Sequence, residues 1–221
     1  IPANFRAESL IGKGLCKQEL QAQLGLAEDA SVPLFGIVTR LASQKGTGMM
    51  RVALPQALDS MRLQLVVLGA GNGDDENFFR WLAQAYPGRV AAEIGYSDEL
   101  SHRIQAGSDF FLMPSLFEPC GLSQLYALRY GSLPVVHATG GLEDTVVQYN
   151  QGEGTGTGFK FYTPAANAFR DTIGWAVSTW YDRPSHITLM REQAMKVRFD
   201  WEMSAKRYLE IYHRALARRG A

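Results

Sequence analysis

The sequence has 221 residues, of which 46% are hydrophobic and 20% are charged. Because 22 Lys and Arg balance 22 Asp and Glu, no overall field attracts nucleic acid or an anionic membrane, and any anion site must be local. No apolar run approaches the roughly 20 residues that cross a bilayer, and the separated cysteines Cys16 and Cys120 give neither a disulfide framework nor a metal-ligand spacing.

Short aliphatic or β-branched runs alternate along the chain with longer amphipathic stretches. The runs predicted as buried parallel strands are 34–39, 63–68, 90–94, 109–113 and 133–136. The stretches predicted as helices between and after them are 47–60, 75–86, 98–106, 122–130 and 142–149. A glycine-rich loop is expected at 151–158, followed by helical stretches at 165–181, 185–197 and 201–216.

This alternation predicts a doubly wound α/β domain with a mostly parallel, Rossmann-like sheet and a helical C-terminal tail. The tail is expected to pack on the sheet or to reach a partner domain. Ligands of such sheets collect beyond the carboxyl ends of the strands. The loops to inspect are therefore 40–46, 69–74, 95–99, 114–123 and 138–141.

The first of these loops carries two cations, Arg40 and Lys45, five residues apart around a turn. An Arg fork and a compact Lys charge together suit a diphosphate. Taken alone, however, the pair is better interpreted as two solvated surface cations.

The loop after the fourth strand is the most informative. Pro119 prevents a helix through Glu118, and Gly121 lets the backbone approach a ligand. The amides of Leu122 and Ser123 would then open a helix whose N-terminus binds phosphate or sugar oxygens. Glu118 is predicted to accept hydrogen bonds from sugar hydroxyls. The alternative is a Glu that caps a helix or forms a salt bridge.

Weaker signals lie on the remaining loops. Tyr96 is a candidate for stacking on a purine, or an ordinary tyrosine, and Thr139, Gly140 and Gly141 offer backbone N–H groups, or simply a strand-to-helix turn. The glycines after the second strand do not complete the dinucleotide fingerprint, so we infer neither NAD nor FAD. The four histidines are scattered, so we expect no metal and no cofactor.

Five motifs, in order and spread over nearly the whole chain, resemble the bacterial glycogen synthase and plant starch synthase family. They are Arg40-Leu-x-x-Gln-Lys-Gly46, Ile94-Gly-Tyr96, Pro114-Ser-x-Phe-Glu-Pro-Cys-Gly-Leu-Ser-Gln-Leu-Tyr126, Arg129-Tyr-Gly131 and Thr139-Gly-Gly-Leu-x-Asp-Thr145. The resemblance implies that residues 1–221 are the C-terminal, donor-binding domain of a two-domain GT-B glycosyltransferase. The acceptor-binding N-terminal domain is then absent from this chain.

The resemblance implies retaining, metal-independent transfer of glucose from ADP-glucose to the non-reducing end of an α-1,4-glucan. It assigns the diphosphate and the leaving ADP to Arg40 and Lys45, the glucose hydroxyls to Glu118, and the adenine to Tyr96. Four residues match the loop around the donor: Cys120, Gly121, Leu122 and Ser123. Ser123 replaces a threonine common in the family, and Tyr126 stands where related transferases carry a second glutamate.

The partners expected from the resemblance are ADP-glucose or ADP and, through the missing domain, the glucan, with no nucleic acid and no membrane. Alone, the chain is expected to bind nucleotide weakly and to transfer little. Its expected location is the cytoplasm of a bacterium or the plastid stroma of a plant or alga. The alternatives are a UDP-sugar-dependent transferase or sugar-nucleotide epimerase of similar fold, or a non-catalytic module that binds nucleotide or glucan.

Overall fold

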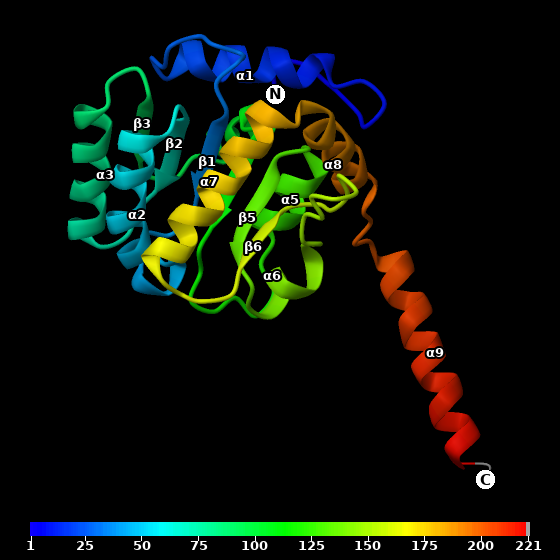
Figure 1. The fold of residues 1–221 in the computed structure, drawn as a ribbon. Coiled ribbons are helices and arrows are strands. Elements are labelled where there is room, and N and C mark those ends of the chain that lie inside the picture. The colour runs from blue at the N-terminus through cyan, green and yellow to red at the C-terminus, as the bar shows by residue number, and fades with distance from the viewer. Residues whose placement is uncertain (220–221) are drawn as a thin grey trace.

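Six parallel strands form one sheet at the centre of the computed structural model, which describes residues 1–219 (Figure 1). They are β1 (Leu34–Val38), β2 (Gln64–Gly69), β3 (Val90–Ile94), β4 (Phe110–Met113), β5 (Leu133–His137) and β6 (Phe159–Phe161). Their order is β3-β2-β1-β4-β5-β6, and each neighbouring pair is parallel. The direction of winding reverses between β1 and β4, so a crevice for a ligand is expected beyond their carboxyl ends.

The described helices are α1 (Ile11–Gln23), α2 (Thr47–Ser60), α3 (Gly73–Ala85), α4 (Asp98–Gly107), α5 (Ser123–Arg129), α6 (Gly140–Thr145), α7 (Ala166–Asp182), α8 (Pro184–Lys196) and α9 (Trp201–Arg219), with a 3-10 turn at Ser43–Lys45. Successive residues of β4 show how the helices form two layers. Phe110 packs in a core cluster with residues of α2, α3, α7 and α8. Phe111 packs in a second cluster with residues of α1, α4, α5 and α6. The doubly wound prediction is confirmed.

Three predictions of local structure need correction. Strand β6 was not predicted, because three residues after a glycine-rich loop are too few to show a periodic pattern. Helix α1 was also missed, since its buried face includes Lys13 and Lys17, which weakens the apolar pattern. The helix predicted at 142–149 is instead α6 and ends at Thr145.

The buried lysines of α1 join a polar network at the amino ends of the strands, opposite the ligand edge. Asp109 is 3% exposed. Its Oδ2 atom accepts a hydrogen bond from the Lys17 ammonium at 2.7 Å, and its Oδ1 atom accepts one from the Arg191 guanidinium. Burial raises the pKa of Asp109, but the two cations outweigh burial and lower it. The network therefore fastens α1 and α8 to the start of β4.

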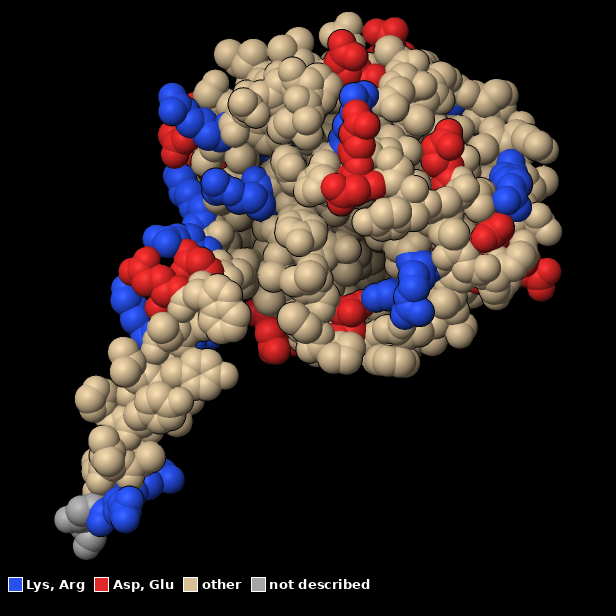
Figure 2. Space-filling view, turned by 180° about the vertical axis from the view of Figure 1, so that it is seen from behind, with Lys and Arg blue, Asp and Glu red and all other residues tan. Residues whose placement is uncertain are grey.

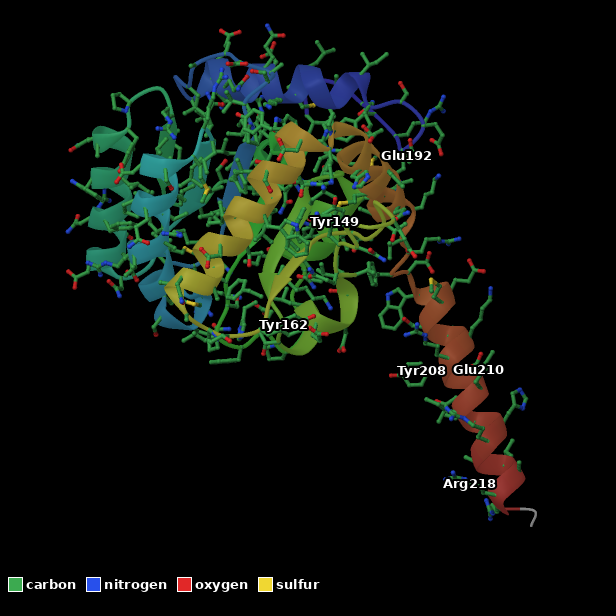
Figure 3. The ribbon with its side chains drawn as sticks, viewed as in Figure 1. Tyr149, Tyr162, Glu192, Tyr208, Glu210 and Arg218 are labelled. Atoms are coloured by element: carbon green, nitrogen blue, oxygen red, sulfur yellow. The ribbon has the colours of Figure 1, made fainter. Side chains whose placement is uncertain are left out.

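Helix α9 stands apart from the sheet and its layers (Figure 1). None of its residues is buried, and its exposed apolar side chains include Trp201 and Tyr212. Tyr208, Glu210 and Arg218 project from α9 into open space, whereas Tyr149 lies inside the domain (Figure 3). Of the predicted helical tail, α7 and α8 pack on the domain and α9 does not.

Charges of both signs are interspersed over the face of the molecule that Figure 2 shows. This distribution agrees with the equal numbers of acidic and basic residues. Within residues 1–219, no helix combines the length and the apolar character needed to cross a membrane.

Candidate functional site

The loops that follow β1 and β4 meet at the point where the winding of the sheet reverses. The Leu116 amide donates to the Gln44 carbonyl oxygen at 2.9 Å, and Gln44 Nε2 donates to the Phe117 carbonyl oxygen at 3.0 Å. Gly46, at φ 79°, lies so close to Pro114 that an added Cβ would be 2.0 Å from the Pro114 carbonyl oxygen. The two predicted loops are therefore one packed unit.

Lys45 and Glu118 come together across this contact, although they are 73 residues apart in the sequence. The Lys45 ammonium donates a hydrogen bond to Glu118 Oε2. Glu118 is 8% exposed, and its Oε2 atom also accepts a hydrogen bond from Ser115 Oγ at 3.2 Å. A cation and a carboxylate thus meet where the two loops join, and Glu118 makes the salt bridge of the alternative interpretation. That Glu118 also binds a sugar stays a prediction.

Arg40 is exposed on the same loop as Lys45. Its Nη2 atom donates to Gln44 Oε1 at 3.3 Å, and no carboxylate among residues 1–219 forms an ion pair with it. A guanidinium with a single neutral partner retains donors for an anion. Arg40 is therefore available to a phosphate group.

The segment from Cys120 to Ser123 forms the turn that opens α5. Gly121 has a φ of 77°, a conformation that favours glycine, and no side chain caps the helix N-terminus. Gln124 Nε2 donates to the carbonyl oxygens of Cys120 at 3.0 Å and Gly121 at 2.9 Å. Cys120 is exposed and Leu122 is 60% exposed. The backbone of this turn is thus fixed while its outer surface is open.

The turn before α6 supports the Glu118 loop from the other side. The Gly141 amide donates to the Glu118 carbonyl oxygen at 2.9 Å. A Cβ on Gly140 would lie 2.2 Å from that same oxygen, and a Cβ on Gly141 would lie 1.9 Å from the Cys120 carbonyl oxygen. The N–H group of Gly141 is therefore already used in a hydrogen bond within the protein. Thr139 is the residue immediately before α6. Gly140 and Gly141 thus contact the backbone of the loop that carries Glu118.

A cavity of about 310 Å³ lies beyond the carboxyl ends of β1, β2 and β3. Its lining residues are Val38, Thr39, Arg40, Leu68, Gly69, Ala70, Gly95, Tyr96, Ser97 and Ser101. Tyr96 is 90% exposed, so its ring is free to cover a flat ligand. Arg40 lines this cavity and donates to Gln44 on the loop that carries Lys45, so the cavity adjoins that loop.

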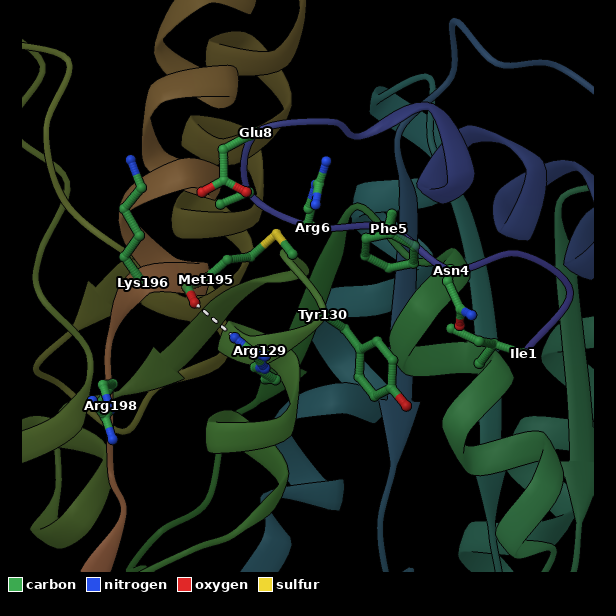
Figure 4. Close-up of a pocket in the computed structure, with 11 residues that line it drawn as sticks. Ile1, Asn4, Phe5, Arg6, Glu8, Arg129, Tyr130, Met195, Lys196 and Arg198 are labelled. Atoms are coloured by element: carbon green, nitrogen blue, oxygen red, sulfur yellow. Dashed lines mark hydrogen bonds between the residues drawn. The ribbon is translucent and has the colours of Figure 1, made fainter. Parts of the chain in front are cut away.

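A larger hollow of about 590 Å³ lies at the opposite edge of the sheet, between the N-terminal segment and the ends of α5 and α8. Figure 4 shows Arg129 there, donating to the Met195 carbonyl oxygen at 3.3 Å. None of the predicted site residues lines this hollow. It is therefore separate from the candidate site.

Several residues that support the site were not among the candidate site residues. Gln44 and Gln124 act by donating to backbone carbonyl oxygens, and His137 donates from Nδ1 to the Ser115 carbonyl oxygen at 2.8 Å. Gln44, Ser115 and Gln124 lie within the quoted motifs, but the motifs do not show which groups they contact. The contact of His137 with Ser115 depends on which strands are neighbours. Within the described part of the chain, no group of three His, Cys, Asp or Glu side chains is arranged to bind a metal ion.

A parallel doubly wound sheet with charged side chains at its switch point belongs to the class of α/β domains that bind ligands beyond the carboxyl ends of their strands. Comparison with known proteins gives the family. The profile described as "Glycosyl transferases group 1" matches residues 17–196, and the chain belongs to this family. The resemblance stated from the motifs is confirmed.

The chain is similar to bacterial glycogen synthases. It is 48% identical to glycogen synthase 1 of Geobacter metallireducens over 219 residues, which cover 99% of this chain and 43% of that protein. The corresponding enzyme of Geobacter sulfurreducens is 49% identical, with 99% and 44% covered. The chain therefore spans less than half the length of these relatives.

A solved structure agrees with this relationship. The catalytic domain of starch synthase IV from Arabidopsis thaliana, bound to ADP and acarbose, superposes with a TM-score of 0.87 at 34% identity. The match covers 98% of this chain and 46% of that one.

Proposed function

We propose that this chain is the donor-binding domain of a glycosyltransferase of the glycogen and starch synthase type. The reaction is transfer of glucose from ADP-glucose to the non-reducing end of an α-1,4-glucan, with retention of configuration. The observation that carries this proposal is the contact of Lys45 with Glu118 between the two loops at the switch point. The names of the relatives and the ADP bound to starch synthase IV support the choice of donor.

In this proposal, Arg40 and Lys45 bind the diphosphate and stabilise the negative charge that develops as ADP leaves. Glu118 accepts hydrogen bonds from the glucose hydroxyls, and Tyr96 covers the adenine. The turn from Cys120 to Ser123 surrounds the sugar and the phosphates, and the residues 139–141 support that turn. Stabilisation of the leaving group needs no nucleophile and no metal from this domain.

We further propose that a second domain, outside this chain, binds the glucan and completes the active site. The chain covers only 43–46% of the length of two bacterial glycogen synthases and of the starch synthase IV structure. Helix α9 has no buried residue and presents exposed apolar side chains suited to packing on such a domain. The glycogen synthases that this chain resembles are bacterial, and we propose the bacterial cytoplasm as its location.

Calorimetric titration of the 221-residue chain with ADP tests the role of the crevice. Lys45→Ala is expected to weaken ADP binding at least tenfold. This factor corresponds to the free energy of about one hydrogen bond between charged groups. Lys206→Ala is the matched control, since Lys206 is exposed on α9 and pairs only with Glu202 among the described residues. Equal affinities of the two variants would contradict the assignment.

The two-domain proposal has its own test. The isolated chain is mixed with ADP-glucose and glycogen, and release of ADP is followed. We expect no release above the background without enzyme, because half of the proposed site is missing. Sustained elongation of the glucan would show that this domain is sufficient.

A further inference from the structure

We infer that Ser115 and His137 are positioning residues that set the orientation of the Glu118 carboxylate. Neither was a candidate for the donor site on the basis of the sequence. This inference rests on the proposed function, in which Glu118 binds the donor sugar. Contacts of Ser115 and His137 then explain why the Glu118 carboxylate, on an irregular loop, takes one orientation.

The Ser115 hydroxyl is the nearer of the two supports. Ser115 is 2% exposed and follows the end of β4 by two residues. Its Oγ atom donates to Glu118 Oε2, the same oxygen that accepts from Lys45. No described residue donates to Oε1. The arrangement therefore commits Oε2 to the protein and leaves Oε1 for a ligand hydroxyl.

Ser115 is in turn fixed by His137 at the end of β5. The Nδ1 atom of His137 lies 2.8 Å from the Ser115 carbonyl oxygen. A carbonyl oxygen only accepts hydrogen bonds, so Nδ1 must carry the hydrogen. The contact fixes the backbone of Ser115, and with it the position from which the hydroxyl reaches Glu118.

The ring of His137 is held by strand β6. His137 is 7% exposed, and its ring centroid is 5.3 Å from that of Phe161, at an interplanar angle of 33°. The parallel register of β5 and β6 places these two residues side by side. A three-residue edge strand that the sequence did not reveal thus supports the crevice through one aromatic contact.

Glu118 Oε2 accepts hydrogen bonds from two donors, Lys45 and Ser115. In the proposed function, Lys45 also binds the diphosphate. When a diphosphate enters, it competes with Glu118 for the Lys45 ammonium. Ser115 has no such competitor, since its side chain is buried. It is therefore the donor that keeps Glu118 in place while Lys45 turns to the phosphates.

The test compares the affinities of ADP-glucose and ADP for the 221-residue chain by calorimetry. The ratio of the two affinities reports contacts to the sugar and cancels those to the nucleotide. Ser115→Ala is expected to lower this ratio about tenfold, the magnitude of one hydrogen bond to a charged group. Ser115→Thr, which keeps the hydroxyl, and His137→Asn, which keeps a donor near Nδ1, are expected to preserve it. His137→Leu is expected to lower it.

Ser178→Ala is the matched control, because Ser178 is exposed on α7 and its hydroxyl donates only to the Trp175 carbonyl oxygen among the described residues. An unchanged ratio in Ser115→Ala would overturn the inference and leave the proposed function intact. Equal losses for both ligands would also overturn it, since they indicate a general structural defect. Failure of the unmodified chain to bind either ligand would instead overturn the proposed function.

Discussion

Replacing Gly46 with Ala tests whether the loops after β1 and β4 form one rigid unit. Gly46 lies between Lys45 and the first residue of α2, at a φ of 79°. An alanine in this left-handed conformation costs about 1–2 kcal/mol. Its Cβ would also lie 2.0 Å from the Pro114 carbonyl oxygen, whereas ordinary contacts begin at 3.4 Å, so the loops must separate by about 1.4 Å.

Such crowding adds about 1–3 kcal/mol, which brings the expected loss for Gly46→Ala to about 2–5 kcal/mol. This is a large share of the roughly 5–15 kcal/mol that stabilises a typical domain. Gly48 provides a matched control two residues away. A Cβ there meets nothing within 4 Å. Gly48→Ala should therefore stabilise α2 slightly, by up to about 1 kcal/mol.

The two variants are compared by urea denaturation and by titration with ADP. Gly46→Ala should unfold at lower urea with an unchanged slope, and it should bind ADP more weakly because Lys45 and Glu118 are moved apart. Gly48→Ala should match the unmodified chain in ADP affinity. If both variants unfold at the same urea concentration and bind ADP equally, the loops are not packed as described.

Three further predictions concern single side chains. Asp109→Asn should lower the free energy of unfolding by about 3–5 kcal/mol in urea, because it leaves Lys17 and Arg191 buried without a countercharge. Since these cations lower the pKa of Asp109 despite its burial, the stabilisation is complete above the unfolded pKa of about 4 and is lost as the pH falls through the folded value. Melting temperatures below about pH 4 should thus fall more steeply for the unmodified chain than for Asp109→Asn. Tyr96→Ala should weaken ADP binding about tenfold in calorimetry and Tyr96→Phe should not, since only the ring face stacks on a base. Arg40→Lys should also weaken it, because Lys lacks the planar fork, and equal affinities would argue against a bidentate contact.

Much of the fold was predictable because a parallel sheet is buried on both faces. Its strands therefore read as continuous apolar runs, and the helices between them read as amphipathic stretches. The positions of the ligand loops followed from topology alone. The prediction failed where this pattern is absent. Strand β6 has only three residues, and α1 buries lysines that donate hydrogen bonds to Asp109 and to backbone carbonyl oxygens.

The candidate site was predictable only at the level of residue types. The motifs indicated Arg40, Lys45 and Glu118, and the topology placed their loops at the same edge of the sheet. The sequence could not show that Lys45 and Glu118 touch. Nor could it show that His137 supports Ser115 across 22 residues, because that contact depends on the pairing of β4 with β5.

The preference of the site for one nucleotide is the most direct test of the proposed function. The 221-residue chain is titrated calorimetrically with ADP, UDP and GDP under the same conditions. We expect ADP to bind most tightly and Lys45→Ala to weaken ADP binding. Tighter binding of UDP than of ADP, or binding of ADP that is indifferent to Lys45, would contradict the proposed function.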